Sequence, residues 1–319
     1  MLNGRLLATN LDSAYGVILS TGLAFLLVFR MNRVAIRWWD TRRMWGIIVE
    51  DVRVLVSGAL AHMDHAPENR DQAIRWIGTF VICVKQNIRD RIGEISDDEL
   101  AGFLAPEDIS PLRQSANPGL YAASEIRYEM KLAFHISPET SAAMGAALSS
   151  ERVLLEQTLN RMIGNMGGLE RVKATPLPIV YVSHLRTLLL FYLLSIPIVY
   201  GDSWGWGTIP AVAVVAFALL GIDGAASECE CPFDRTRGNH LDMDTYCLVA
   251  MDNILQLVVH AAEMELRRNG DTKINRSVCQ KKAEHVVKES DKPELPCGIF
   301  DGGADSNVES VYNHHHIRE

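Results

Sequence analysis

The sequence lacks the short motifs by which many enzymes are recognised. Its 319 residues contain no HExxH zinc-protease motif and no glycine-rich phosphate loop. Glu228 and Glu230 come closest to a paired-carboxylate acid–base site, yet no histidine or nucleophile accompanies them. The sequence therefore predicts a protein without a catalytic site or a cofactor, in which the two glutamates form structural ion pairs.

Cysteine is scarce and irregularly spaced. The six cysteines form no CxxC pair, and Cys229-x-Cys231 has no second ligand cluster, so no metal site is predicted. The net charge is −8, and the densest group of arginines is confined to one helix end. Both features argue against a nucleic-acid partner.

Long apolar runs are few, but three are present. Ala14–Phe29 has 16 uncharged residues and Trp204–Ile222 has 19, close to the roughly 20 that cross a ~30 Å hydrocarbon core. A third run lies within Leu177–Tyr200, and the polar turn Gly201–Ser203 joins it to the next run. These two runs are predicted to form a transmembrane hairpin. The chain is therefore expected to be an all-α, multi-pass integral membrane protein.

A dense basic segment follows the first apolar run at once. Arginine occurs at positions 30, 33, 37, 42 and 43, a pattern typical of a helix that leaves a membrane on its cytoplasmic side. Trp38 and Trp39 are expected at the membrane interface. Arg33 and Arg43 are interpreted as anchors that fix this orientation.

The rest of the sequence predicts cytosolic helices. Apolar residues recur every three or four positions over residues 73–92 and 155–166, and Gly167-Gly168 is expected to end the second helix. A further helix is expected over residues 246–266. The predicted order is a transmembrane helix (1–32), a cytosolic helical region (33–176), the transmembrane hairpin (177–222), a cytosolic segment and helix (223–266) and a polar, disordered tail (267–319).

Several short motifs follow one another along the chain, and they fall into two groups. The first group is Phe29-Arg30-x-Asn32, Arg37-Trp38-Trp39-Asp40 and Arg42-x-x-Trp45-Gly46. The second is Ser115–Pro118, Gly168–Val172, Thr175–Pro178, Glu228-x-Glu230-x-Pro232-Phe233 and Leu241–Cys247. In this order and approximate spacing they resemble the bestrophin family, in its bacterial, fungal and plant-like branch. The resemblance spans about residues 14–265.

The resemblance implies an ion channel that conducts chloride and other small monovalent anions through a hydrophobic neck on the axis of a homopentamer. The family's second transmembrane helix lines the conduit, and residues 14–29 correspond to it. Because three spans are predicted here and the family has four, the first is expected to be missing, either in this protein or through a truncated gene. A cation-selective channel, a non-conducting scaffold and a membrane-embedded enzyme are the alternatives.

Thr21, Phe25 and Phe29 are the predicted neck residues. Steps of four residues keep them within about 80° on one helical face. Aromatic side chains that face lipid or pack on another helix would show the same spacing, and the resemblance is what implies the neck. Thr175 falls near the family's cytosolic aperture; alternatively, it caps the N-terminus of a helix that begins around Pro176.

The remaining motif residues are interpreted as structural. The arginines at positions 30 and 37 are expected to pair with carboxylates at positions 40, 228 or 230 and to brace helix against helix. In animal bestrophins an acidic run after the Pro-Phe pair binds calcium. Here one aspartate and two arginines follow, which cannot supply the oxygen ligands that calcium needs. The structural set is Arg30, Asn32, Arg37, Trp38, Trp39, Trp45, Glu228, Glu230, Pro232 and Phe233.

Overall fold

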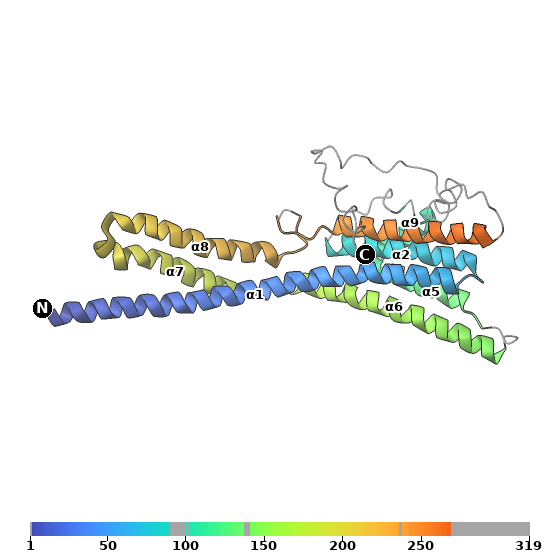
Figure 1. Cartoon of the computed structure of the whole chain (residues 1–319), viewed down its shortest axis with the longest axis horizontal. Helices are drawn as coiled ribbons and strands as arrows, with labels where there is room; N and C mark the ends of the chain where they lie inside the picture. Colours follow the sequence, from blue (N-terminus) through green and yellow to red (C-terminus); the bar gives the residue numbers. More distant parts are fainter. Residues whose placement is uncertain (1, 90–99, 101–102, 137–140, 236–237, 269–319) are drawn as a thin grey trace, which may run out of the picture.

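The computed structural model describes residues 2–89, 100, 103–136, 141–235 and 238–268, with side chains from residue 16 onward. The described residues form helices and connections without any strand, which confirms the all-α prediction. The predicted disordered tail lies outside this part of the chain except for residues 267 and 268. Figure 1 shows an elongated molecule with a helical hairpin at one end and a helical bundle at the other.

One long helix, α1 (Leu2–His62), runs through both ends of the molecule (Figure 1). No proline interrupts it. The other elements are α2 (Pro67–Ile88), α4 (Pro106–Gln114), α5 (Pro118–Ala133), α6 (Ala142–Ala174), α7 (Ile179–Trp204), the 3-10 turn η2 (Gly205–Gly207), α8 (Thr208–Glu230) and α9 (Met243–Arg268).

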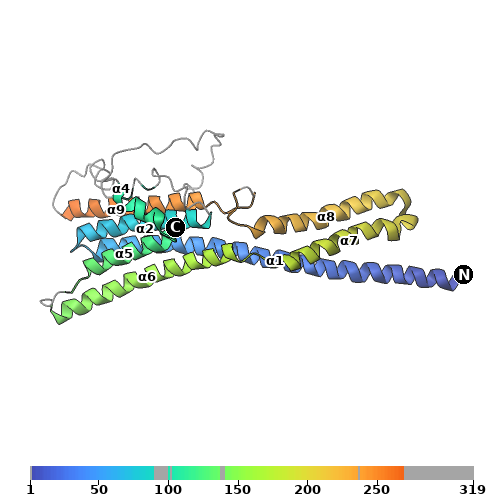
Figure 2. The ribbon, with the colours of Figure 1, turned by 180° about the vertical axis from the view of Figure 1, so that it is seen from behind.

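The bundle end consists of the C-terminal half of α1 with α2, α5, α6 and α9 (Figure 2). Its core includes Trp45 of α1, Phe80 of α2 and Ile254 of α9, all buried. Two sequence motifs meet here, because Glu170 of α6 accepts hydrogen bonds from the Asn117 side chain at 2.8 Å and from the Asn87 side chain at 2.7 Å. Asn117 also accepts from the Leu120 amide at the start of α5, so this contact ties a helix cap to two other helices.

The hairpin end consists of α7 and α8 packed against the N-terminal half of α1. A separate apolar cluster joins these helices, made of Leu23, Leu27, Leu185, Leu189, Leu193 and Ile196. The outer surface of the hairpin is also apolar, with Ile179, Val180, Leu194, Ile198, Trp206, Val214 and Phe217 exposed. Such a continuous exposed apolar surface is typical of helices that face lipid.

Three helical stretches in the described part are long and apolar enough to cross a membrane: Gly16–His62, Ile179–Glu230 and Met243–Arg268. The first two overlap the three runs predicted from the sequence. The third stretch is α9, which places Cys247, Ala250 and Ile254 in the core of the bundle.

The structure corrects the position of the hairpin turn. Gly201–Ser203, predicted as the turn, is the last part of α7, and the reversal occurs at Gly205–Gly207. Gly205 has φ of 52°, a conformation that residues with a Cβ rarely adopt, and this fixes the turn there rather than at the polar residues.

The predicted end of the helix at Gly167-Gly168 is also wrong. Helix α6 continues to Ala174. A Cβ atom at Gly168 would overlap the Met44 sulfur, so this glycine allows α6 to approach α1 closely instead of ending the helix.

The stability of the protein is expected to depend on the protonation of Glu125, a residue of α5 that interacts with Asp108 of α4. Burial, followed by repulsion from Asp108 and Glu129, raises the pKa of Glu125 above its usual range, although a hydrogen bond from Tyr121 opposes this. Ionisation of Glu125 at neutral pH therefore lowers stability. Glu125→Gln is expected to stabilise the protein by on the order of 0.5 kcal/mol at neutral pH.

Because the raised pKa favours the folded state when Glu125 is protonated, the advantage of Glu125→Gln should disappear below about pH 4. Thermal unfolding of the purified protein at several pH values measures this. Glu68→Gln, at an exposed position in the first turn of α2, serves as the control and should bring no gain. An equal gain for Glu125→Gln at all pH values would contradict the explanation.

Candidate functional site

One face of α1 stays uncovered along most of the helix. Viewed down the helix axis, the side chains of this face point within about 40° of the direction of the Phe25 side chain, at 100° per residue. This open face of α1 includes Thr21, Phe25, Phe29, Asn32, Ile36, Trp39, Arg43, Glu50, Val54 and Ser57, all exposed, and Ile47, which is half-buried. Residues on the packed side, such as Leu27, Val34 and Val52, are buried. The three predicted neck residues therefore share a face that no other helix of the chain covers.

The aromatic residues of the open face are well exposed near the hairpin end. Phe25 is 70% exposed and Phe29 is 49% exposed. Phe29 is oriented by an edge contact with Tyr181 of α7, with ring centroids 6.5 Å apart. Tyr181 in turn donates a hydrogen bond from its hydroxyl to the Leu26 carbonyl at 3.0 Å. The start of α7 thus fixes the Phe29 ring beside the open face.

Arg30 is the centre of a buried ionic cluster on the opposite side of α1. Its guanidinium is fully buried and pairs with Asp223 and, at 3.3 Å, with Glu230. It also donates to the Ser227 hydroxyl at 3.1 Å. Arg186 of α7 joins the cluster through Asp223 at 3.1 Å and Ser227 at 2.7 Å. Two cations and two carboxylates therefore tie α1, α7 and α8 together.

The expected pairing of Arg30 with Glu230 is present, but Asp223 and Arg186 were not foreseen. A signal existed in the sequence, since Asp223 directly follows the apolar run and lies four and seven residues before Ser227 and Glu230. That spacing puts all three side chains on one helical face.

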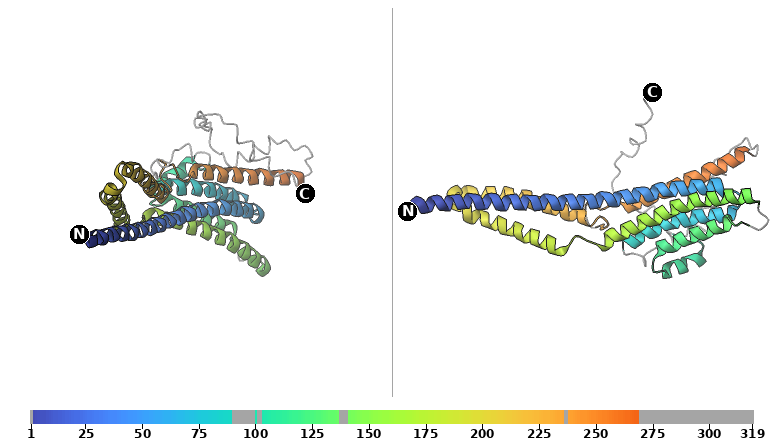
Figure 3. Two further views of the ribbon diagram at one scale, coloured as in Figure 1. Left: turned by 60° about the vertical axis from the view of Figure 1, so that its left-hand side comes forward. Right: turned by 90° about the horizontal axis from the view of Figure 1, so that it is seen from below.

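Arg37 has different partners from those predicted. It donates to the backbone carbonyls of Val172 and, at 2.5 Å, of Thr175. These carbonyls end α6 and lack partners within the helix, so the arginine caps the helix C-terminus. Figure 3 shows that the link from α6 to α7 lies beside the middle of α1, where this contact holds it.

Thr175 is the C-cap of α6, with its hydroxyl donating to the Arg171 carbonyl at 2.6 Å. The predicted N-cap role is therefore wrong. Pro176 and Pro178 disfavour helical conformations in the residues before them, so α7 begins only at Ile179. The Thr175 side chain is exposed.

The three tryptophans of the motif occupy different environments. Trp45 is fully buried and stacks with Tyr246 of α9, with centroids 6.2 Å apart. Trp38 donates a hydrogen bond to the Asn239 carbonyl at 2.9 Å and so fixes the connection between α8 and α9. Trp39 is 64% exposed on the open face, which also includes Asn32.

The connection after α8 is held by neutral and ionic contacts. Glu228 accepts a hydrogen bond from the Gly238 amide at 3.2 Å, and the Pro232 carbonyl accepts from the Leu241 amide at 2.7 Å. Pro232 is buried, and Phe233 packs against the bundle core. Among the described residues no group of three or more His, Cys, Asp or Glu could hold a metal ion.

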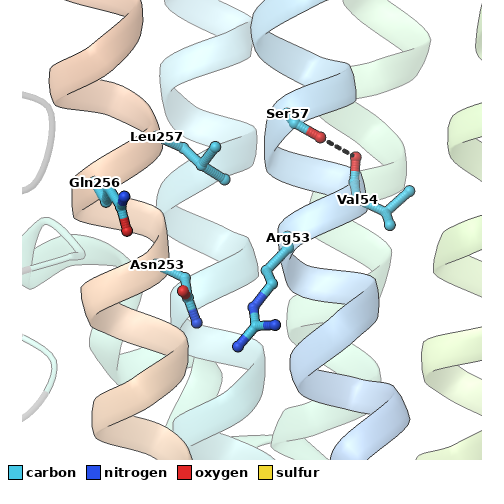
Figure 4. A pocket seen from close by; sticks show the side chains of 6 residues that line it. All are labelled: Arg53, Val54, Ser57, Asn253, Gln256 and Leu257. Carbon is cyan, nitrogen blue, oxygen red and sulfur yellow. Dashed lines mark hydrogen bonds between the residues drawn. The ribbon is translucent and has the colours of Figure 1, made fainter. Parts of the chain in front are cut away.

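At its far end the open face borders a groove of about 280 Å³ between α1 and α9. Figure 4 shows Val54 and Ser57 of α1 on one side of it, with Arg53 pointing between the helices. Asn253, Gln256 and Leu257 of α9 complete the lining. The residues of the groove carry a single charge and no acid–base pair.

The segment Gly201–Gly205 has the letters of the nucleophile motif G-x-S-x-G. In hydrolases that motif lies on a sharp turn between a strand and a helix. Here Ser203 lies at the end of an apolar helix, where its hydroxyl donates to the Tyr200 carbonyl at 3.2 Å. The segment is therefore a helix end and not a nucleophile elbow.

Comparisons with known proteins agree with this architecture. A relative from Nostoc sp., a voltage-dependent anion channel-forming protein, is 29% identical over 260 residues, which cover 80% of this chain and 81% of the relative. Voltage-dependent chloride channel 1 of Arabidopsis thaliana chloroplasts is 23% identical over 239 residues, covering 74% and 54%.

The fold matches the crystal structure of a bacterial bestrophin homologue from Klebsiella pneumoniae. The TM-score is 0.66 at 21% sequence identity, covering 76% of this chain and 86% of that one. The family described as bacterial/fungal bestrophin proteins matches residues 2–256. The resemblance seen in the motifs is thereby confirmed, and the chain, an integral membrane protein, belongs to the bacterial and fungal bestrophin family.

Proposed function

We propose that this chain is a subunit of a membrane channel for chloride and other small monovalent anions. Its family consists of ion channels rather than enzymes, and the Nostoc and Arabidopsis relatives are named for anion and chloride conduction. The observation that supports the proposal most strongly is the open face of α1. Its residues from Thr21 to Ser57 are exposed except for the half-buried Ile47, although the opposite side of the helix is packed over the same length.

Copies of α1 around a common axis would turn their open faces toward one another. In the homopentamer that the family resemblance implies, five copies of Phe25 and of Phe29 form two rings about 6 Å apart along the helix. A ring of apolar side chains opposes ion passage because an ion must shed water where nothing replaces it. Phenyl edges carry partial positive charge, so edges toward the axis favour anions. Five copies of Thr21 form a third, outermost ring, which is more polar than the two phenylalanine rings.

We further propose that residues 1–32 and 177–222 lie in the bilayer, and that residues 33–176 and 223–266 lie in the cytosol with Thr175 near the aperture. Two separate apolar clusters support this division, one between α1 and the hairpin and one within the bundle. The arginine-rich segment of α1 lies between them. On this proposal α9 is a bundle helix in spite of its apolar composition.

Reconstitution in planar bilayers tests the proposed function. In an asymmetric sodium chloride gradient the current of the purified protein should reverse near the chloride equilibrium potential. Reversal near the sodium potential would mean a cation channel, and intact oligomers without current would mean a scaffold. Native mass spectrometry should give five copies per oligomer, and a monomer in mild detergent would contradict the assembly.

Calcium is not expected to gate this channel. Arg235, after the Pro-Phe pair, forms an ion pair with Asp244, with its Nη2 3.7 Å from Oδ2. The Asp244 carboxylate therefore already faces a cation. Hard calcium ions need several oxygen ligands, which this basic segment does not provide. Currents should be equal in chelator and in micromolar calcium. A steep calcium dependence that Asp234→Ala abolishes would contradict this prediction.

A further inference from the structure

The five arginines that follow the first apolar run fall into two groups. Three have partners within the chain: Arg30 pairs with carboxylates, Arg37 binds carbonyls, and Arg42 lies over the Tyr246 ring with its Cζ 4.6 Å from the centroid. Arg33 and Arg43 are exposed, and within the described residues no ion pair or hydrogen bond involves either of them. Their charges are therefore available to something outside the chain.

The direction of each side chain separates these two arginines. Arg43 lies eighteen positions after Phe25, which is five turns at 3.6 residues per turn. Both side chains therefore leave the helix in the same direction, about 27 Å apart along it. Arg33 leaves the helix about 80° away from that direction, toward the edge of the open face. A conduit lined by Phe25 would thus also contain Arg43.

We propose that Arg43 forms a second selectivity site, an anion-concentrating ring in the conduit about 21 Å beyond Phe29. This inference rests on the proposed function, because the ring exists only if several copies of α1 surround one axis. The guanidinium is always charged and weakly hydrated, so it attracts a monovalent anion without a strong hydration barrier. Rings of charged side chains act in this way in other channels, where Arg and Lys favour anions.

A carboxylate of opposite sign follows on the same face. Glu50 leaves the helix about 20° from the direction of Phe25 and lies about 10 Å beyond Arg43. It is exposed, and no ion pair of Glu50 occurs among the described residues. An anion coming from the bundle end would meet Glu50 first and Arg43 next. The two charges are therefore expected to have opposite effects on anion flux.

Single-channel recording in symmetric sodium chloride tests the site with three matched variants: Arg43→Gln, Glu50→Gln and Arg33→Gln. Screening extends over ~30 Å at 0.01 M salt and only ~3 Å at 1 M, so the effects should be large at low salt and small at high salt. At low salt Arg43→Gln should lower the chloride current about twofold or more, and Glu50→Gln should raise it. Arg33→Gln should leave it unchanged.

Arg43→Lys keeps the charge and should retain the low-salt current, which separates a role of the charge from a role in packing. Equal effects of Arg43→Gln and Arg33→Gln, or a loss in Arg43→Gln that persists undiminished at 1 M salt, would overturn the site. A normal current from Arg43→Gln in a conducting protein overturns this inference alone. A wild-type protein that assembles but does not conduct overturns the proposed function, and the site with it.

Discussion

Replacing Phe25 and Phe29 together by alanine is expected to raise the conductance or the open probability of the channel. Both rings are exposed on the open face of α1, so their removal widens and wets the narrowest part of the proposed conduit. The dewetting barrier that an apolar ring imposes should fall accordingly. If the phenyl edges contribute to selectivity, the preference for anions should weaken at the same time.

Reversal potentials in asymmetric chloride salts, recorded with open probability, measure both effects. Leu26→Ala is the matched control, because Leu26 packs against the cluster between α1 and the hairpin instead of lying on the open face. It should act through packing, at a stability cost of about 1 to 3 kcal/mol, and leave the reversal potential unchanged. If the control and the double variant behave alike, the conduit does not follow the open face.

Removal of the Arg30 side chain should cause the largest loss of stability. Arg30 is fully buried between Asp223 and Glu230, and Arg186 can compensate only part of their charge because its side chain is 48% exposed. Breaking a buried ion pair by removing one partner leaves an uncompensated charge, which costs about 3 to 5 kcal/mol. Arg30→Ala should therefore unfold at a clearly lower temperature, or fail to assemble.

Thermal unfolding in detergent measures the loss of stability, and size-exclusion chromatography of the unheated protein shows whether it assembles. Arg33→Ala removes an exposed arginine from the same helix and should change stability by no more than about 0.5 kcal/mol. An Arg30→Ala protein as stable as Arg33→Ala would show that the ionic cluster does not brace α1 against the hairpin.

The apolar runs predicted the apolar helices of the hairpin end, although the predicted position of its turn was wrong. Uncharged stretches such as Trp204–Ile222 have few alternatives to a buried or lipid-facing helix, so composition decides their structure. Glu230, which pairs with Arg30, was one of the three carboxylates predicted as partners of Arg30 and Arg37. Residue type alone was therefore enough to predict the apolar helices and a carboxylate partner for Arg30.

Details that depend on how helices meet in space were not predictable. Thr175 ends α6 instead of starting the next helix, and its carbonyl accepts a hydrogen bond from Arg37, far away in the sequence. Gly168 was predicted to end its helix, but α6 continues to Ala174, and a Cβ at Gly168 would overlap Met44 of α1. The open face itself was foreseen at three positions only, because periodicity shows which residues share a face but not which face remains uncovered.

Cysteine modification during recording tests whether the open face of α1 lines the conduit. Asn32 lies on that face about 20° from the direction of Phe25, and its neighbour Arg33 lies about 80° away. A charged thiol reagent should change the current of Asn32→Cys and leave that of Arg33→Cys equal to the wild-type response, to which the exposed native Cys231 contributes. Modification that affects Arg33→Cys alone, or both variants equally, would show that the open face of α1 does not line the conduit.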